Sequence, residues 1–228
     1  MVDRFSGGAA SRLAVVSENF VLDPRSVAFA EDFVPAPEQV RTARRNAIAA
    51  DAPAPSNGIT TALTFLARIL DATAVVEIGT GTGTSGLALF EGMNPKGVLT
   101  SIDSEVDWQL DAKQAFRDHQ IPSQRFRLIA GRPLDVLNNL RDAAYDLVLI
   151  NADKLEYVEY VAQAERLLRV GGVALINDAL WQGLVADPSD DSDETVIVRE
   201  ALTAVKESEA FTSLMLPLGE GLVAAIKN

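Results

Sequence analysis

The sequence of 228 residues contains no cysteine, which excludes disulfide bonds and thiolate metal sites. Positive charge is also scarce: 20 Lys and Arg residues stand against 32 Asp and Glu residues, and the net charge is −12. A chain this acidic is not expected to bind nucleic acid through a basic face. No stretch approaches the roughly 18 apolar residues of a membrane span, and residues 1–8 have no apolar signal core. We therefore expect no membrane segment and a cytoplasmic location.

Length and composition indicate an ordinary globular protein. The chain is 48% hydrophobic and 23% charged, and its length suits one domain with a full core. We expect a single domain over residues 1–228, with a helical N-terminal extension at 1–50 and an α/β core at 51–228. Asp23-Pro24 and Pro35-Ala36-Pro37 are expected to break the extension into two or three helices.

Three arginines, Arg41, Arg44 and Arg45, lie close together in this otherwise acidic chain. They form either the solvated face of a helix or a functional element of the N-terminal segment. In the second case they would be a patch for an anionic substrate or part of a lid over the site. The sequence leaves both interpretations open.

The stretch around which the chain is organised, residues 73–86, reads Thr-Ala-Val-Val-Glu-Ile-Gly-Thr-Gly-Thr-Gly-Thr-Ser-Gly. Its apolar start predicts a buried strand, and the residues from Ser85 onwards predict a helix. Gly79, Gly81 and Gly83 lie between the two, where glycine permits a sharp turn and lets a ligand approach the backbone closely. This pattern is typical of a nucleotide-binding unit.

A second apolar strand ends at Asp103, twenty residues after Gly83, where a carboxylate can accept hydrogen bonds from ribose hydroxyls. These features do not choose between NAD(P) and S-adenosylmethionine, since both carry an adenosine ribose. The spacing Gly81-x-Gly83-x-x-Gly86 even fits the dinucleotide pattern. Glu77, at the end of the first strand, favours a cationic ligand over a pyrophosphate.

Strand and helix patterns alternate along the rest of the chain. Strands are predicted at 74–78, 98–103, 125–130, 145–151 and 173–177, and then at 211–217 and 222–227 with no helix between these two. We therefore expect an α/β fold with a mostly parallel seven-stranded sheet, helices on both faces and an antiparallel C-terminal hairpin. A helix at 155–169 is expected to be capped by Gly171-Gly172, and Trp108 is expected to pack within the helix at 105–118.

Four motifs follow one another along the chain. They are Val76-Glu77-Ile78-Gly79 through Gly83-Thr84-Ser85, Asn151-Ala152-Asp153-Lys154, Leu180-Trp181-Gln182-Gly183, and Leu216-Pro217-Leu218-Gly219-Glu220-Gly221. In this order they resemble class I S-adenosylmethionine-dependent methyltransferases, and more narrowly the O-methyltransferase family of catechol and caffeoyl-CoA O-methyltransferases and their bacterial relatives. The resemblance runs from about residue 54 to the C-terminus and implies a Rossmann-like, doubly wound fold. The terminal hairpin, which dinucleotide dehydrogenases lack, favours S-adenosylmethionine as the cofactor.

The resemblance also implies a set of cofactor contacts. Ser85 would bind the methionine carboxylate at a helix N-terminus, and Asp103 would hold the ribose. Asp153 would approach the sulfonium. The remaining contacts implied by the resemblance are Pro55 and Ser56 in the loop before the first core helix, Glu77, Gly79, Thr80 and Gly83 along the methionine and ribose, Ser104 near the ribose, and Gly131, Arg132 and Pro133 at the adenine.

The catalytic position implied by the resemblance is Lys154, which would act as the base beside a divalent cation, usually Mg²⁺. The cation would bind at Asn151, Asn177 and Asp178, where the family has a larger share of carboxylates. Neutral amide oxygens at these places should weaken Mg²⁺ binding considerably, because Mg²⁺ favours carboxylate oxygen. Asn151 and Trp181 would also border the acceptor, although Trp181 fits core packing nearly as well.

These observations predict an S-adenosylmethionine-dependent O-methyltransferase that acts on a small hydroxylated acceptor, for example an aromatic one. The changed metal positions keep a second hypothesis open, in which the protein binds the cofactor but has lost or altered catalysis. A third hypothesis is an NAD-dependent oxidoreductase. By analogy with the family we also expect a homodimer formed through N-terminal helices.

Overall fold

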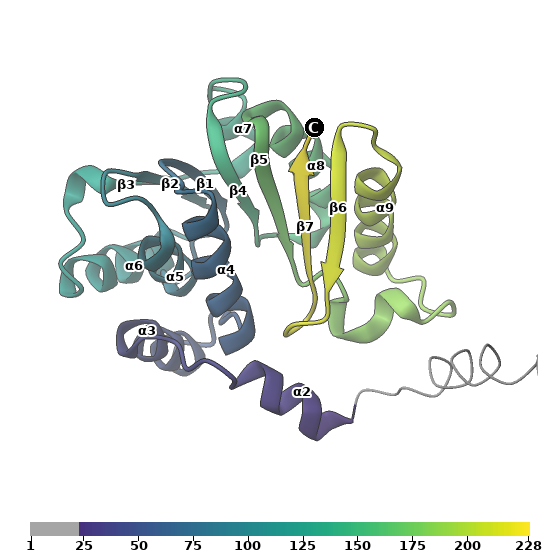
Figure 1. The fold of residues 1–228 in the computed structure, drawn as a ribbon, viewed down its shortest axis with the longest axis horizontal. Coiled ribbons are helices and arrows are strands. Elements are labelled where there is room, and N and C mark those ends of the chain that lie inside the picture. Colours follow the sequence, from purple (N-terminus) through teal and green to yellow (C-terminus); the bar gives the residue numbers. More distant parts are fainter. Residues whose placement is uncertain (1–22) are drawn as a thin grey trace, which may run out of the picture.

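The computed structural model describes residues 23–228 and contains a seven-stranded sheet with the order β3-β2-β1-β4-β5-β7-β6 (Figure 1). The strands are β1 (Ala74–Ile78), β2 (Val98–Asp103), β3 (Phe126–Ala130), β4 (Tyr145–Ile150), β5 (Leu168–Asn177), β6 (Phe211–Leu216) and β7 (Leu222–Lys227). β1 to β5 are parallel, and β7 runs antiparallel to both β5 and β6. The predicted fold class is therefore confirmed, including the terminal hairpin.

Helices cover both faces of the sheet (Figure 1). One face carries α3 (Glu38–Ala49), α4 (Asn57–Ile69), α5 (Thr84–Gly92) and α6 (Val106–Asp118), and the other carries α7 (Pro133–Leu137), α8 (Tyr157–Leu167) and α9 (Asp193–Glu207). The chain also forms α2 (Pro24–Glu31) and three 3₁₀ helices at Ser123–Arg125, Lys154–Glu156 and Trp181–Ala186. None of the helices in this described part of the chain has the length and apolar character needed to cross a membrane.

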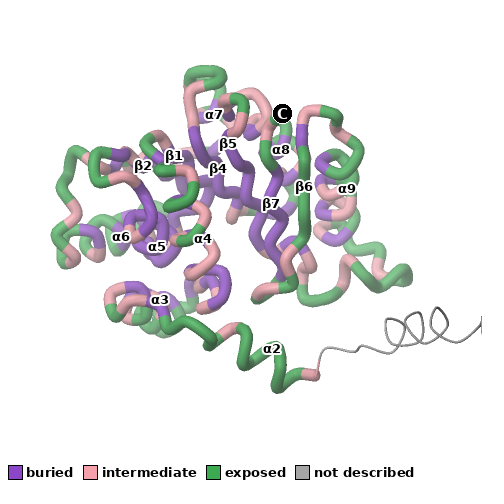
Figure 2. Tube along the Cα trace, in the orientation of Figure 1, coloured by how far each residue is buried: buried purple, intermediate pink, exposed green. Residues whose placement is uncertain are grey.

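The central strands are buried on both faces, as Figure 2 shows. In β4, Leu147 and Leu149 pack into the core under α4 and α5, whereas Val148 and Ile150 pack into the core under α8 and α9. Successive side chains of a strand point to opposite faces, so one continuous apolar run supplies both cores.

The N-terminal segment breaks at the two predicted places. α2 begins at Pro24 and α3 begins directly after Pro37, while the predicted helical piece before residue 23 lies outside the described residues. Val40 and Ala43 of α3 are part of the core around α5. α2 has no buried residue, but its last residue, Glu31, accepts a hydrogen bond from the amide of Gly58 at 2.7 Å.

The prediction for the end of the helix at 155–169 is wrong. α8 ends at Leu167, and Leu168 is already extended and pairs with Tyr145. Gly171 and Gly172 therefore lie inside β5 and cap nothing. The register shifts between this pair and the next, so the additional residues of β5 form a bulge that Gly171 accommodates with φ +76°.

Candidate active site

A cavity of about 560 Å³ lies at the edge of the sheet where the parallel strands end. Most of the predicted site residues line it: Pro55, Gly79, Thr80, Ser85, Asp103, Ser104, Arg132, Pro133, Asn151, Asp153, Lys154 and Asp178. The predicted residues that do not line it are Ser56, Glu77, Gly83, Gly131, Asn177 and Trp181. Ligands of open α/β sheets bind in this position, outside the carboxyl ends of the strands.

Two glycines of the turn after β1 leave no room for a side chain. At Gly79, with φ +95°, an added Cβ would lie 1.9 Å from the carbonyl oxygen of Asn151. Gly83, with φ +91°, forms the N-cap of α5, and an added Cβ would lie 3.0 Å from the Cα of Ala112. Gly79 therefore lets β1 and β4 meet at the cavity, and Gly83 lets α5 pack against α6.

Glu77 lies beneath this turn and is completely buried. Its carboxylate accepts hydrogen bonds from the hydroxyls of Ser85 and Ser101, each at 2.5 Å. Burial, with a smaller contribution from Asp103, raises the pKa of Glu77 to about 7, although the two serine hydrogen bonds act in the opposite direction. Glu77 thus holds Ser85 in place and puts a titratable acid directly under the cavity.

The hydrogen bonds continue from Ser101 to the wall of the cavity. The hydroxyls of Ser101 and Thr80 lie 2.7 Å apart. The side-chain amide of Gln109 donates to Thr80 at 3.1 Å and to the carbonyl oxygen of Ile129 at 3.0 Å. This network connects β1, β2, β3 and α6 and fixes Thr80, which lines the cavity.

Asp103 closes β2 and borders the cavity. Its Oδ2 accepts from the amide of Gly81 at 2.8 Å, and its Oδ1 accepts from the amide of Glu105 at 2.9 Å. Each carboxylate oxygen keeps acceptor capacity for a ligand hydroxyl. Trp108 borders the same cavity, so it is more than helix packing. Its place five residues after Asp103, in the first turn of the following helix, is the signal that could have indicated this.

Thr84, at the start of α5, also lines the cavity and was not predicted as a site residue. Its hydroxyl is buried and has no hydrogen-bond partner among the described residues. The first backbone N–H groups of a helix also lack intrahelical partners. Hydroxyl and amides together have the donors that an anion beside Ser85 would need.

The residues beyond β3 and β4 complete the wall. The guanidinium of Arg132 lies 3.5 Å from the carboxylate of Glu156, which also accepts from the hydroxyl of Tyr160. Pro133 begins α7 directly after Arg132. Asp153 caps the 3₁₀ helix that carries Lys154 by accepting from the amide of Leu155 at 3.0 Å.

Lys154 is largely buried at the floor of the cavity. Its Nζ donates to the Oδ2 of Asp178 at 2.9 Å and to the carbonyl oxygen of Ala152 at 3.1 Å. The ammonium also lies 4.9 Å from the centre of the Tyr157 ring and 5.2 Å from that of Trp181. Trp181 thus contacts the site through Lys154, but it is only half-buried and does not line the cavity, so it is not a core residue.

The three predicted metal positions meet, but their contacts do not suit Mg²⁺. Asn177 donates its side-chain amide protons to the Oδ1 of Asn151 and to the Oδ1 of Asp178, both at 2.9 Å. Asp178 is the only carboxylate of the three and already pairs with the Lys154 ammonium. Residues 23–228 hold no cluster of three or more His, Cys, Asp or Glu side chains that could bind a metal ion. A cation here would have to approach an ammonium and displace two amide hydrogen bonds.

The family model described as O-methyltransferase matches residues 38–228 of this chain. A relative from Mycobacterium sp. (strain KMS), which carries a provisional O-methyltransferase name, is 43% identical over 89% of this chain and 92% of its own length.

The chain belongs to the O-methyltransferase family.

Two solved structures are similar to this chain in sequence and in fold. A Corynebacterium glutamicum protein is 31% identical, with a TM-score of 0.81 over 87% of this O-methyltransferase and 94% of its own chain. The second structure is the O-methyltransferase TomG from Streptomyces achromogenes, which takes part in tomaymycin synthesis and was solved with SAM. It is 26% identical, with a TM-score of 0.78 over 89% of this chain and 95% of its own chain.

Proposed function

We propose that this O-methyltransferase transfers the methyl group of S-adenosylmethionine to a hydroxyl of a small acceptor, for example an aromatic one. Family membership supports this function, as does TomG, which was solved with SAM. The observation that carries the proposal is the cavity at the strand ends, which brings Asp103 at the end of β2, the N-terminus of α5 and Lys154 to one place.

The walls of the cavity fit the parts of this cofactor. Asp103 would accept hydrogen bonds from the ribose hydroxyls, and the N-terminus of α5, with Thr84 and Ser85, would bind the methionine carboxylate. Trp108 and Arg132 would border the adenine. The further cofactor contacts we propose are Pro55, Gly79, Thr80, Ser104, Pro133 and Asp153, with Glu77, Gly83 and Gly131 supporting them from behind the wall.

Bound S-adenosylmethionine supplies an electrophilic methyl group on a positively charged sulfur. The protein has to align the acceptor oxygen with that methyl group and stabilise the oxygen as it loses its proton. Lys154 is the group at the floor of the cavity that can do so. Its ammonium, which pairs with Asp178, can stabilise the oxyanion, and its nitrogen can accept the proton only after it has released one of its own. Since the donors at Asn151, Asn177 and Asp178 do not fit Mg²⁺, we assign no step to a metal ion.

One observation favours a second candidate function. The same amide contacts that disfavour Mg²⁺ would also remove the clamp for a vicinal diol, so the protein could bind the cofactor without methylating catechols. A methyl-transfer assay with isotope-labelled S-adenosylmethionine and a catechol panel, run with Mg²⁺ and with EDTA, separates the two. We expect labelled product in both conditions. Product that disappears with EDTA would contradict the metal assignment, and cofactor binding without any product would favour the second function.

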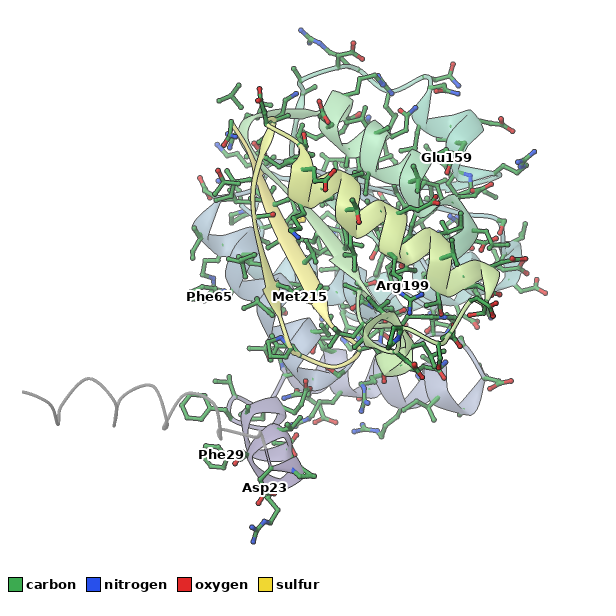
Figure 3. The ribbon with its side chains drawn as sticks, turned by 90° about the vertical axis from the view of Figure 1, so that its right-hand side faces the viewer. Asp23, Phe29, Phe65, Glu159, Arg199 and Met215 are labelled. Atoms are coloured by element: carbon green, nitrogen blue, oxygen red, sulfur yellow. The ribbon has the colours of Figure 1, made fainter. Side chains whose placement is uncertain are left out.

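Assembly and location form part of this proposal. We propose a homodimer that uses the N-terminal helices, because Phe29 of α2 and Phe33, which follows α2, are each 71% exposed and Figure 3 shows Phe29 pointing away from the body of the protein. We also propose a cytoplasmic location, with which the absence of cysteine is compatible. Sedimentation at several concentrations, with a Phe29→Ser/Phe33→Ser variant as the comparison, tests the dimer.

A further inference from the structure

A second, smaller hollow adjoins the large cavity on the side of α3. Its volume is about 290 Å³, and the two hollows share Pro53, Pro55, Asn151 and Asp178 in their walls. This volume is near the lower limit for small-molecule sites, so the hollow suits a compound with a single ring. We name it the acceptor hollow, because it lies beside Lys154's partner Asp178 and shares only Pro55 and Ser56 with the predicted cofactor contacts.

Arg44 brings a guanidinium to the acceptor hollow from α3. Its Nε donates to the carbonyl oxygen of Pro55 at 2.9 Å, which holds the side chain against the loop before α4. Its two terminal amino groups have no hydrogen-bond acceptor and no carboxylate partner within residues 23–228. A half-buried guanidinium with free N–H groups favours a planar anion such as a carboxylate.

The neighbouring arginines are bound differently. Arg41 and Arg45 both pair with Glu38, and Arg45 also donates to the hydroxyl of Thr42 at 2.8 Å. Both border a groove on the other side of α3, to which Arg44 also contributes, but neither lines the acceptor hollow. Arg41 and Arg45 therefore form a solvated helix face, and only Arg44 of the three reaches the site.

The floor of the acceptor hollow holds an unused hydrogen-bond acceptor. Asn177 lines the hollow, is 3% exposed and has an Oδ1 without a partner in the described part of the chain. Its amide protons are already donated to Asn151 and Asp178. An acceptor oxygen buried in this way lacks a donor, and a ligand hydroxyl would supply one.

The charges of the lining residues leave Arg44 as the place for an anion. Asp178 pairs with Lys154, and the carboxylate of Glu220 accepts from the amide of Gln182 at 2.8 Å. Arg44 is the one cation among the residues that line the acceptor hollow, all of which belong to the described chain. We propose that the methyl acceptor is a hydroxylated carboxylic acid, whose carboxylate binds Arg44 and whose hydroxyl donates to the Oδ1 of Asn177. This inference rests on the proposed function.

The test is a calorimetric titration of the full chain saturated with S-adenosylhomocysteine. The probes are 3,4-dihydroxybenzoate and its neutral analogue 3,4-dihydroxybenzamide. We expect the acid to bind about tenfold more tightly than the amide, because one charge-assisted pair at a half-exposed site contributes about that much. Arg44→Gln should bring the ratio close to one and leave the amide affinity unchanged, whereas Arg45→Gln, the matched control on the same helix, should keep the ratio.

Three results would overturn the proposal: equal affinities in the unchanged protein, no binding of the acid, or a preference that survives Arg44→Gln. The S-adenosylhomocysteine titration is made first and on every variant. Lack of binding in that step would overturn the proposed function and this inference together. Normal cofactor binding with no preference for the acid would overturn this inference alone.

Discussion

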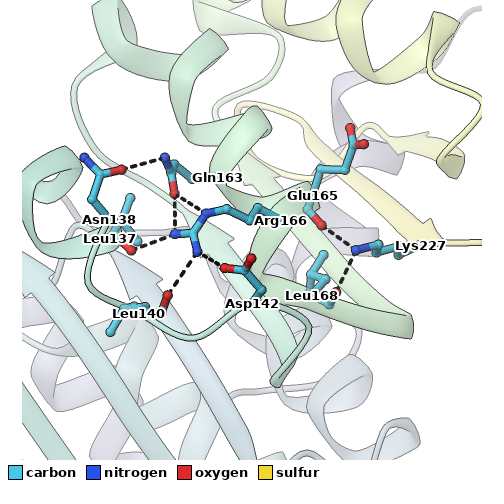
Figure 4. A network of polar contacts seen from close by, with 9 residues as sticks. All are labelled: Leu137, Asn138, Leu140, Asp142, Gln163, Glu165, Arg166, Leu168 and Lys227. Carbon is cyan, nitrogen blue, oxygen red and sulfur yellow. Dashed lines mark hydrogen bonds and ion pairs between the residues drawn. The ribbon is translucent and has the colours of Figure 1, made fainter.

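The polar groups at the two ends of the parallel strands differ in how fully they are hydrogen-bonded. At the amino end, Arg166 donates to the carbonyl oxygens of Leu137 and Leu140 and pairs with Asp142, and Lys227 donates to two further carbonyl oxygens (Figure 4). At the carboxyl end, the side-chain oxygens of three buried residues lack a partner within residues 23–228: Thr82, Thr84 and Asn177. The hydrogen-bonded groups at the amino end stabilise the fold, whereas the unpaired oxygens at the carboxyl end can bind ligands.

The pKa values of the buried carboxylates at the two ends are shifted in opposite directions. At the amino end, burial alone would raise the pKa of Asp146, but hydrogen bonds from Ala74 and Thr73 and the contact with Arg169 together lower it. At the carboxyl end, burial raises the pKa of Glu77 to about 7 because its two serine contacts do not compensate. The comparison indicates that charge at the amino end stabilises the fold, whereas charge at the carboxyl end costs stability.

The largest expected effect is the loss of turnover on replacing Lys154. Lys154→Met should lower turnover by about 10²–10³-fold, because the group that accepts the proton or stabilises the oxyanion is removed. Cofactor affinity should change less than about threefold. Steady-state kinetics and calorimetry measure the two quantities. Lys227→Met is the control from the amino end and should keep turnover, and equal losses in turnover and cofactor affinity for Lys154→Met would indicate a structural role.

The second effect concerns the pH dependence of folding. Glu77 has an ordinary pKa near 4.5 when unfolded and about 7 when folded, so the folded state binds the extra proton between these values. Stability should therefore fall as pH rises from about 4.5 to 7, and by linkage the difference is about 3 kcal/mol. Glu77→Gln lacks this titration. The free energy of unfolding of the variant, relative to that of the unchanged protein, should therefore increase as pH rises over the same range. Urea unfolding at pH 5 and pH 8 measures this, and parallel behaviour of the two proteins would contradict it.

The third prediction concerns the ribose contact. Asp103→Ala should weaken binding of S-adenosylhomocysteine by about 1.5–3 kcal/mol, because charge-assisted hydrogen bonds to the ribose and the support of Gly81 are lost. Calorimetric titration gives the change. Asp146→Ala, which removes a buried carboxylate from the other end, should lower stability and leave cofactor affinity unchanged. Unchanged affinity in Asp103→Ala would refute the ribose assignment.

The smallest expected effect is structural. Arg166→Met should lower the free energy of unfolding by about 2 kcal/mol, because the carbonyl oxygens of Leu137 and Leu140 lose their donor. Thermal unfolding should show a decrease of roughly 4–8 °C for a domain of this size. Cofactor affinity should stay the same, and a loss of affinity without a loss of stability would break the division between the two ends.

The framework of the fold could be predicted from the sequence, because it depends on local patterns. The apolar runs gave the strands, and the glycines between Ile78 and Thr84 gave the first turn. The end of α8 could not be predicted in this way. Leu168 leaves the helix because it pairs with Tyr145, a contact made across the sheet, and the two glycines that follow are also compatible with a helix cap.

The candidate site could be predicted where a residue type has a fixed place after a strand, as for Asp103, or where a motif resembles that of the family, as for Lys154. The roles of the other site residues depend on their burial and their hydrogen-bond partners in the folded protein. Nothing in the sequence shows that Glu77 contacts two serines or that the buried hydroxyl of Thr84 lacks a partner among the described residues. The three neighbouring arginines also look alike in the sequence, and their contacts in the folded protein separate them, with Glu38 for Arg41 and Arg45 and with Pro55 for Arg44.

The most direct test of the central claim is a crystal structure of the protein with S-adenosylhomocysteine. The account predicts ribose hydroxyls within hydrogen-bond distance of the Asp103 carboxylate and the amino-acid carboxylate at the N-terminus of α5, in contact with the Thr84 hydroxyl. A nucleoside bound elsewhere, or one bound in this cavity with its ribose turned away from Asp103, would contradict the account.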